Sequence, residues 1–200
     1  MNRGQRFARL ATDVVVRQPV LWSLFRRATR KQFDKLAPVW DARRDPAAFA
    51  SVTAALDTLP APPRRVLDLG TGTGSAARLV SARFPEAEVV GVDLSEAMVE
   101  EARAKTGDGR VRYIVADAQH LPFEDGAFDL VTLANMIPFF DELARVVAPG
   151  GRVLFSFSVG PATPIYVAPE RLRAELGRRG FGDFEELAAG KGTALLARKL

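Results

Sequence analysis

The stretch at residues 65–74, RVLDLGTGTG, constrains the fold of this 200-residue chain more than any other feature. Its short apolar run is typical of a buried parallel strand, and the run stops abruptly at three alternating glycines. Helix-forming residues follow Gly74. Because glycine has no Cβ, the backbone can turn sharply there and approach a ligand, while free N–H groups at the helix start point toward it. The stretch predicts a ligand site, although a tight strand-to-helix turn without a ligand has the same signature.

The rest of the chain alternates apolar runs with helix-forming segments. Further strands are expected at 88–93, 111–117, 128–133, 152–157, 184–187 and 193–198. Helices are expected at 46–59, 95–105, 141–147 and 169–179, and residues 149–151, Pro-Gly-Gly, predict a hard turn. Strands that alternate with helices predict an α/β fold, a doubly wound parallel sheet with helices on both faces.

The N-terminal segment differs in charge from the rest of the chain. Residues 1–35 carry a net charge of +7, whereas the whole chain carries +4. Two short helices are expected at 5–17 and 20–32, broken at Pro19. They can pack on the domain, cover a pocket as a lid, or lie on an anionic membrane. We therefore divide the chain into an N-terminal helical segment or lid, residues 1–45, and a main domain, residues 46–200.

Composition excludes several kinds of site. The chain has no cysteine, which removes disulfides, thiolate metal sites and a cysteine nucleophile. His120 is its only histidine, so no metal site is expected. No apolar stretch has the length of a membrane span or the form of a signal peptide, and we expect a cytoplasmic protein.

Three acids lie at or near the ends of the first three expected strands of the main domain, namely Asp68, Asp93 and Asp117. Ligands of such sheets bind beyond the carboxyl ends of the strands, and an acid about 20 residues past the glycine loop suits a ribose diol. Asp93 has that position. Each acid alone is equally well explained as a turn or capping residue.

Two classes of ligand compete for this loop. Gly72, Gly74 and Ala77 satisfy a relaxed dinucleotide fingerprint, but that register leaves Gly70 unexplained. The carboxylate of Asp68 would repel a pyrophosphate and attract an ammonium or sulfonium group. The charge pattern therefore favours a cationic ligand over a dinucleotide.

Five segments in order resemble the motifs of class I S-adenosylmethionine-dependent methyltransferases. They are residues 66–74, 90–95, 117–123, 128–131 and 145–151. The last two resemble signatures of the small-molecule subgroup related to the ubiquinone and menaquinone C-methyltransferases. The resemblance implies a Rossmann-like, mostly parallel seven-stranded sheet with an antiparallel last strand, and S-adenosylmethionine as cofactor, with S-adenosylhomocysteine as its product.

The same resemblance implies roles for individual residues. The methionine moiety would be lined by Gly70, Thr71, Gly72 and Gly74, with Asp68 near its amino group and Asn135 near the same end. Asp93 would hold the ribose hydroxyls. The adenine would be met by Leu94, Met98, Asp117 and Ala118, and Trp40 would cover the cofactor.

The implied reaction is an in-line displacement, because the methyl group of a sulfonium is already activated. It needs an acceptor nucleophile held about 3 Å away in a dry pocket and no covalent intermediate. A general base would help a hydroxyl or an acidic carbon to react. His120, Asp141 and Tyr166 are the candidates, and none of them is assigned.

The expected partner is a small-molecule acceptor. The loop at 134–140 is apolar, which favours a partly hydrophobic acceptor contacted by Met136 and Phe139, although Ile137 and Phe139 fit a core-filling role as well. The loop lacks the Asn-Pro-Pro-aromatic sequence of enzymes that methylate nucleic-acid bases, so a nucleic-acid partner is not expected. The basic N-terminus leaves open an RNA- or membrane-directed enzyme, or a non-catalytic cofactor-binding protein. An NAD-dependent oxidoreductase is less favoured.

Overall fold

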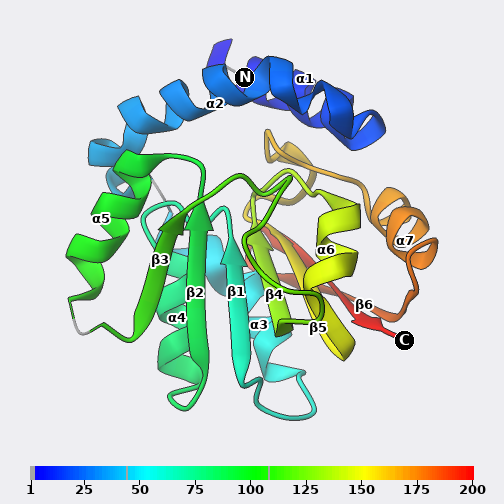
Figure 1. Cartoon of the computed structure of the whole chain (residues 1–200). Coiled ribbons are helices and arrows are strands. Elements are labelled where there is room, and N and C mark those ends of the chain that lie inside the picture. Colours follow the sequence, from blue (N-terminus) through cyan, green and yellow to red (C-terminus); the bar gives the residue numbers. More distant parts are fainter. Residues whose placement is uncertain (1–2, 44, 108) are drawn as a thin grey trace.

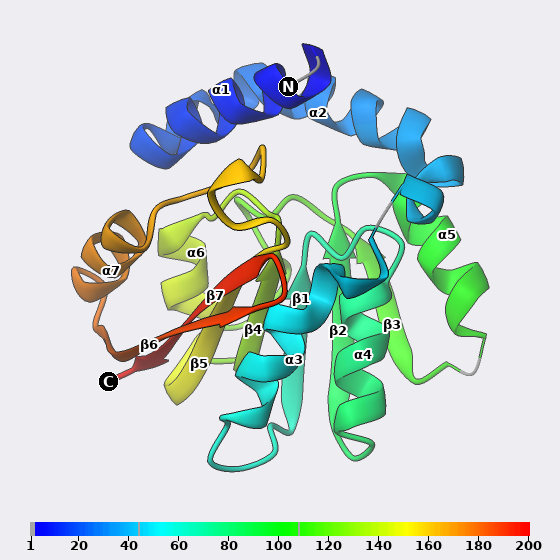
Figure 2. The ribbon, with the colours of Figure 1, turned by 180° about the vertical axis from the view of Figure 1, so that it is seen from behind.

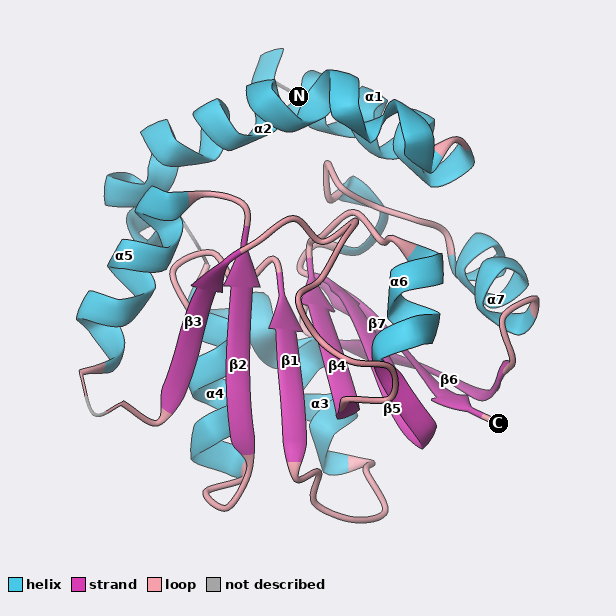
Figure 3. Ribbon diagram, in the orientation of Figure 1, coloured by secondary structure: helices cyan, strands magenta, loops and turns pink. Residues whose placement is uncertain are grey.

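A computed structural model describes residues 3–43, 45–107 and 109–200. Its centre is a seven-stranded sheet with the order β3-β2-β1-β4-β5-β7-β6 (Figures 1 and 3). The strands are β1 (Arg65–Leu69), β2 (Glu88–Asp93), β3 (Val111–Val115), β4 (Phe128–Ala134), β5 (Val147–Phe157), β6 (Phe181–Ala189) and β7 (Gly192–Lys199). Only β7 runs antiparallel to its neighbours, so the expected mostly parallel sheet with an antiparallel last strand is confirmed.

The strand order reverses beside β1. From β1 the chain moves outward to β2 and β3, then returns to place β4 on the other side of β1. The loops after β1 and β4 therefore diverge at the carboxyl edge of the sheet. A crevice at such a reversal is where ligands of open α/β sheets bind.

Helices cover both faces of the sheet. The first core cluster is formed with α3 (Ala50–Asp57), α4 (Ser75–Arg83) and α5 (Glu96–Thr106), of which α3 and α4 lie in front in Figure 2. The second is formed with α6 (Phe140–Val146) and α7 (Pro169–Gly177). Parallel strands buried on both faces read as continuous apolar runs, which explains the pattern of β1 and β2.

Several bounds differ from the expected ones by a few residues, since β3 ends at Val115 and not at 117, and β6 spans Phe181–Ala189 and not 184–187. Two local expectations differ in kind. Residues 46–49 form a 3-10 turn capped by Asp45, and the α-helix begins only at Ala50. The Pro-Gly-Gly segment is not a turn before β5 but lies within it, as a bulge where Phe128 pairs with Val147 and Leu130 with Arg152. A Cβ at Gly151 would lie 2.9–3.1 Å from three carbonyl oxygens, so this bulge requires glycine.

The N-terminal helices form an arch across the carboxyl edge of the sheet (Figures 1 and 2). The arch, residues 3–36, consists of α1 (Arg3–Arg17), a 3-10 turn (Pro19–Leu21) and α2 (Trp22–Leu36), and it breaks at the expected proline. Its inner face joins the second core cluster through Ala11, Val15, Val16 and Trp22. Among the described residues, no helix has the length and apolarity needed to cross a bilayer.

Candidate functional site

The glycine loop joins β1 to α4 and exposes its backbone toward the crevice. Gly70, Gly72 and Gly74 have φ angles of 72°, 54° and 79°, in the left-handed region that side chains rarely adopt. The N–H groups of Gly70 and Thr71 donate to the carbonyl of Val92 at 2.8 and 2.9 Å, which ties the loop to β2. A Cβ at Gly74 would lie 2.5 Å from the Tyr113 hydroxyl, so the loop is also packed tightly from behind.

Asp93 ends β2 beside this loop. Its carboxylate accepts hydrogen bonds from the N–H of Gly72 at 2.8 Å and of Ser95 at 2.9 Å. Burial raises the pKa of Asp93 from 3.8 to about 6, although those two N–H groups act in the opposite direction. The negative charge of Asp68 adds to the increase. A carboxylate held in this way keeps lone pairs free to accept from two neighbouring hydroxyl groups.

Asp68 lies behind the loop instead of in front of it. Its carboxylate is buried and accepts from the hydroxyls of Thr71 at 2.6 Å and Thr132 at 2.7 Å. Asp68 is not among the residues that line the adjoining cavity. The expected place of Asp68 near the amino group of the cofactor stays a prediction. The carboxylate holds the loop to β4.

Asp117, past the end of β3, is bound to the arch. It accepts from the indole N–H of Trp22 at 2.9 Å and pairs with Arg26 at 3.2 Å. The backbone N–H of Gln119 donates to the same carboxylate at 3.0 Å. The acid expected at the adenine is thus also the point where α2 is fastened to the sheet.

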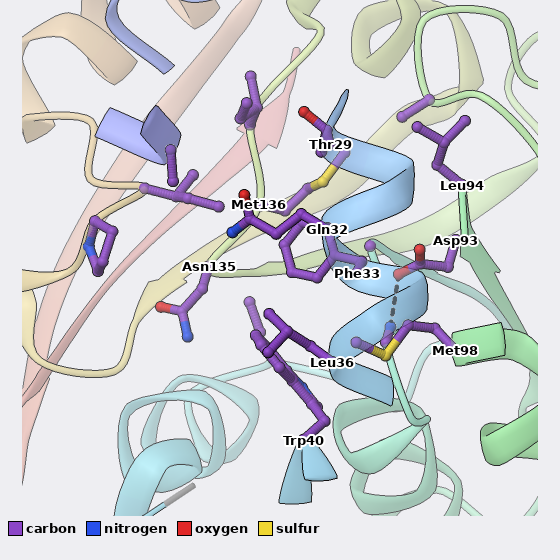
Figure 4. Close-up of a pocket in the computed structure, with 18 of the residues that line it drawn as sticks. Thr29, Gln32, Phe33, Leu36, Trp40, Asp93, Leu94, Met98, Asn135 and Met136 are labelled. Atoms are coloured by element: carbon purple, nitrogen blue, oxygen red, sulfur yellow. Dashed lines mark hydrogen bonds between the residues drawn. The ribbon is translucent and has the colours of Figure 1, made fainter. Parts of the chain in front are cut away.

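A single cavity of about 880 Å³ connects these groups beneath the arch (Figure 4). Nine of the twelve residues expected from the sequence line it: Trp40, Gly70, Gly72, Asp93, Leu94, Met98, Asp117, Ala118 and Asn135. Asp68, Thr71 and Gly74 lie behind the lining. A Cβ at Gly72 would meet only Trp40 Nε1 at 3.5 Å, so the loop is open to the cavity there, whereas a Cβ at Gly70 would lie 2.7 Å from Met136 Sδ.

Asn135 follows β4 with a φ of 55°, a conformation uncommon for a residue other than glycine. Its side-chain amide donates to the Ser158 hydroxyl at 3.1 Å, and its carbonyl oxygen accepts from the Ser158 N–H at 2.9 Å. These bonds fix the loop that carries Met136 into the cavity. Ile137 lines the cavity as well, whereas Phe139 does not and packs instead on Trp22, with ring centroids 5.5 Å apart.

The arch and the segment after β5 supply lining residues that the sequence did not identify individually. They include Gln5, Ala8, Thr29, Gln32, Phe33, Leu36, Thr163 and Ile165. In Figure 4 the labelled side chains of α2 enter from one wall and Met136 from another. The helical spacing of α1 and α2 indicated an inner face but not the surface that this face meets. A lid was one of three interpretations of the same pattern, and no individual lining residue had been assigned to it.

None of the three candidate bases is among the described residues that line the cavity. Asp141 is paired with Arg179 at 2.6 Å, and the ring of Tyr166 packs on Phe157 at 4.9 Å between centroids. His120 is exposed. In the described ranges no group of three or more His, Cys, Asp or Glu residues could hold a metal ion.

Comparisons with known proteins agree with this geometry. Residues 66–151 match the model of the family described as "Methyltransferase domain". A demethylmenaquinone methyltransferase of Thermus thermophilus is 48% identical over 102 residues, which cover 46% of each chain. A malonyl-[acyl-carrier protein] O-methyltransferase of Legionella pneumophila is 43% identical over 109 residues, 50% of this chain and 38% of the relative. The chain therefore spans about half the length of these relatives or less.

The fold is also that of a solved structure. A SAM-dependent methyltransferase from Aquifex aeolicus superposes with a TM-score of 0.67 at 19% identity, over 86% of this chain and 98% of that chain. These matches do not favour the dinucleotide alternative.

Proposed function

The chain belongs, through residues 66–151, to the methyltransferase domain family, and on this premise we propose that it transfers the methyl group of S-adenosylmethionine to a small, partly hydrophobic acceptor. The observation that carries the proposal is the sequence of groups along one cavity. The glycine loop, the half-buried acid Asp93 and the arch-bound acid Asp117 all line it, and they lie at or just after the ends of β1, β2 and β3, which are neighbours in the sheet. These groups suit a methionine moiety, a ribose and an adenine, respectively.

The residues present fit the cofactor. Gly72 offers backbone that only Trp40 approaches, whereas Met136 packs against Gly70, and Asp93 retains acceptor capacity for the ribose hydroxyls. Leu94 and Met98 supply apolar surface for the adenine, and Asp117 an acceptor for its amino group. Trp40, packed edge-on against Phe33 at 5.5 Å, covers the glycine loop.

Bound S-adenosylmethionine would supply a methyl group that already has a good leaving group. The work left to this chain is to orient the acceptor and to exclude water. The arch does both: it covers the cavity and contributes part of its lining. We infer that residues 1–45 act as the lid of the site and that residues 46–200 hold the cofactor.

Charge around the cavity restricts the acceptor. Among the described lining residues the only carboxylates are Asp93 and Asp117, both at the cofactor end, and the only cations are Lys31 and Lys35. A cationic amine would find no counter-ion near Met136 and Ile165. A neutral or anionic apolar molecule fits this lining.

The relatives suggest the first acceptors to test. A demethylmenaquinone matches the apolar lining. Malonyl-[acyl-carrier protein] is the alternative that the second relative suggests. Methylation at carbon would require a proton acceptor on the substrate or in bound water, because no side chain of the described lining is an evident base apart from the two acids.

The proposal is tested by calorimetry followed by turnover. S-adenosylhomocysteine should bind in the micromolar range or tighter, NAD should not bind, and Asp93→Ala should abolish the heat of binding. Labelled methyl transfer is then measured with demethylmenaquinone, with malonyl-[acyl-carrier protein] and with a fractionated metabolite extract. Binding of NAD in preference to S-adenosylhomocysteine would refute the proposal, as would an unchanged affinity in Asp93→Ala.

A further inference from the structure

The arch has an outer face that the core does not use. Val20 and Leu24 are 74% and 71% exposed, more than any other large hydrophobic side chain of the described residues, and Leu10 is 57% exposed. Single exposed hydrophobics are common on protein surfaces. Here, however, three such side chains lie on one segment: Leu10 on α1, Val20 in the 3-10 turn and Leu24 on α2. The inner face of the same helices is buried in the core.

Basic side chains continue the same rows. Helical spacing aligns Leu10 with Arg6 and Arg17 on α1. On α2 it aligns Leu24 with Arg27, Lys31 and Lys35. We call the docking face the exposed set Arg6, Leu10, Arg17, Val20, Leu24, Arg27, Lys31 and Lys35. Asp13 is the only exposed acid on the described part of the arch. Arg17, Arg27, Lys31 and Lys35 form no ion pair with any described residue, so this positive charge is not neutralised internally.

The partner of such a face must be anionic and must accept aliphatic side chains. RNA meets the first condition, but single-stranded RNA is bound largely by stacking of bases on aromatic rings. The aromatic residues of the arch are turned elsewhere. Trp22 is buried against Phe139 and bonded to Asp117, and Phe7 packs with Phe25 at 6.0 Å between centroids. An anionic bilayer meets both conditions, because aliphatic side chains enter its interface while arginine and lysine remain at the phosphates.

The docking face also adjoins the site. Lys31 and Lys35 are exposed on α2 and at the same time line the cavity. A bilayer against the arch would therefore lie beside an entrance to the acceptor end. In Figures 1 and 2 the arch lies at one extreme of the molecule, with the amino ends of the central strands pointing away from it.

We propose that the outer face of the arch docks on an anionic lipid surface, from which the partly hydrophobic acceptor enters the cavity. The second half of this statement rests on the proposed function, whereas the docking itself does not. Cations and exposed aliphatic side chains contribute separately, so binding is weakened both by salt and by loss of Val20 and Leu24.

The test is flotation of the full chain with phosphatidylcholine vesicles, with and without phosphatidylglycerol, in the absence of cofactor and acceptor. We expect binding to the vesicles that contain phosphatidylglycerol only. Arg17→Ser/Arg27→Ser should weaken it about thirtyfold, since each cation near an anionic surface contributes about a factor of five. Val20→Ser/Leu24→Ser should weaken it about tenfold. Arg64→Ser/Arg112→Ser removes the same charge at the amino ends of β1 and β3 and should have little effect.

The proposal would be overturned if the chain bound neutral vesicles as well as anionic ones, or bound neither. It would also be overturned if Arg64→Ser/Arg112→Ser weakened vesicle binding as much as Arg17→Ser/Arg27→Ser does. The same holds if the chain bound homopolymer RNA more tightly than vesicles and Val20→Ser/Leu24→Ser left that RNA binding unchanged. Calorimetry with S-adenosylhomocysteine on the same preparations tests the proposed function separately. None of the substituted residues lines the cavity, so each variant should bind S-adenosylhomocysteine as the unmodified chain does.

Discussion

Cofactor affinity should depend on pH through Asp93. The ionised carboxylate can accept from Gly72, Ser95 and two ribose hydroxyls together, whereas the protonated group loses acceptor capacity. Its pKa of about 6 in the free protein places this change in a range that is easy to study. Ligand binding should favour the ionised form and thereby lower the pKa.

The size of this pH effect follows from the pKa shift of Asp93. Moving the pKa from 3.8 to about 6 means that ionisation of Asp93 costs the folded protein about 3 kcal/mol. Because the folded pKa lies above the unfolded one, the contribution of Asp93 to stability is fully present below about pH 4 and is lost as the pH rises to about 6. The affinity for S-adenosylhomocysteine depends on pH in the opposite direction, because it increases as Asp93 ionises. Affinity for S-adenosylhomocysteine should be constant well above pH 6 and about tenfold lower at one unit below the pKa.

Calorimetric titration with S-adenosylhomocysteine between about pH 5 and 8 measures this dependence. Asp93→Asn should bind weakly at every pH and without the slope. His120→Gln removes the only histidine of the chain and should keep the slope. A flat profile for the unmodified protein, or the same slope in Asp93→Asn, would show that Asp93 does not control binding.

Four further substitutions test other contacts. Gly91→Ala places a Cβ 2.6 Å from the Tyr113 ring and 2.8 Å from Thr71 Oγ1, so urea denaturation should show a loss of about 1–3 kcal/mol, with weaker S-adenosylhomocysteine binding; unchanged stability would contradict this close approach. Phe139→Ala should lower the free energy of unfolding by about 3–5 kcal/mol, because Phe139 is buried in the core. Met136→Ala should mainly raise the KM for the acceptor, because Met136 lines the cavity. A large loss of stability in Met136→Ala with a raised KM in Phe139→Ala would contradict both assignments. Trp22→Phe removes the N–H that Asp117 accepts and should cost about 1.5–3 kcal/mol in the same denaturation assay. Equal stability of Trp22→Phe would mean that this bond does not fasten the arch.

Features with a local cause could be predicted from the sequence. The apolar run at 88–93 is a strand with the expected bounds, and the apolar run before the glycines is a strand at 65–69, because burial on both faces selects such runs. Ser95 caps α5 by accepting from the N–H of Met98, as its position before the helix predicted. The order of strands and helices along the chain was sufficient for the fold class.

The prediction for the Pro-Gly-Gly segment was wrong because the deciding neighbour is distant in sequence, and the surroundings of Asp68 also depend on a distant residue. The Pro-Gly-Gly segment has the composition of a turn, yet pairing with β4 keeps it inside a strand. Asp68 has the charge to attract a cation, and its carboxylate accepts from the hydroxyl of Thr132, 64 residues away, while its place near the amino group of the cofactor stays a prediction. Neither partner is visible in a local pattern.

The sequence by itself determined the class of fold, the position of the glycine loop and the acid beside it, since periodicity, backbone freedom and spacing are properties of short segments. Only the tertiary structure decided that Asp117 is shared between the cavity and the arch, and that Met136 faces the cavity while Phe139 does not. It also decided that Leu10, Val20 and Leu24 of the arch point away from the core. The pattern of α1 and α2 allowed packing, a lid or a membrane face. Their inner side packs over the cavity, which leaves the outer side open, because a helix presents two faces and its neighbours determine which one is buried.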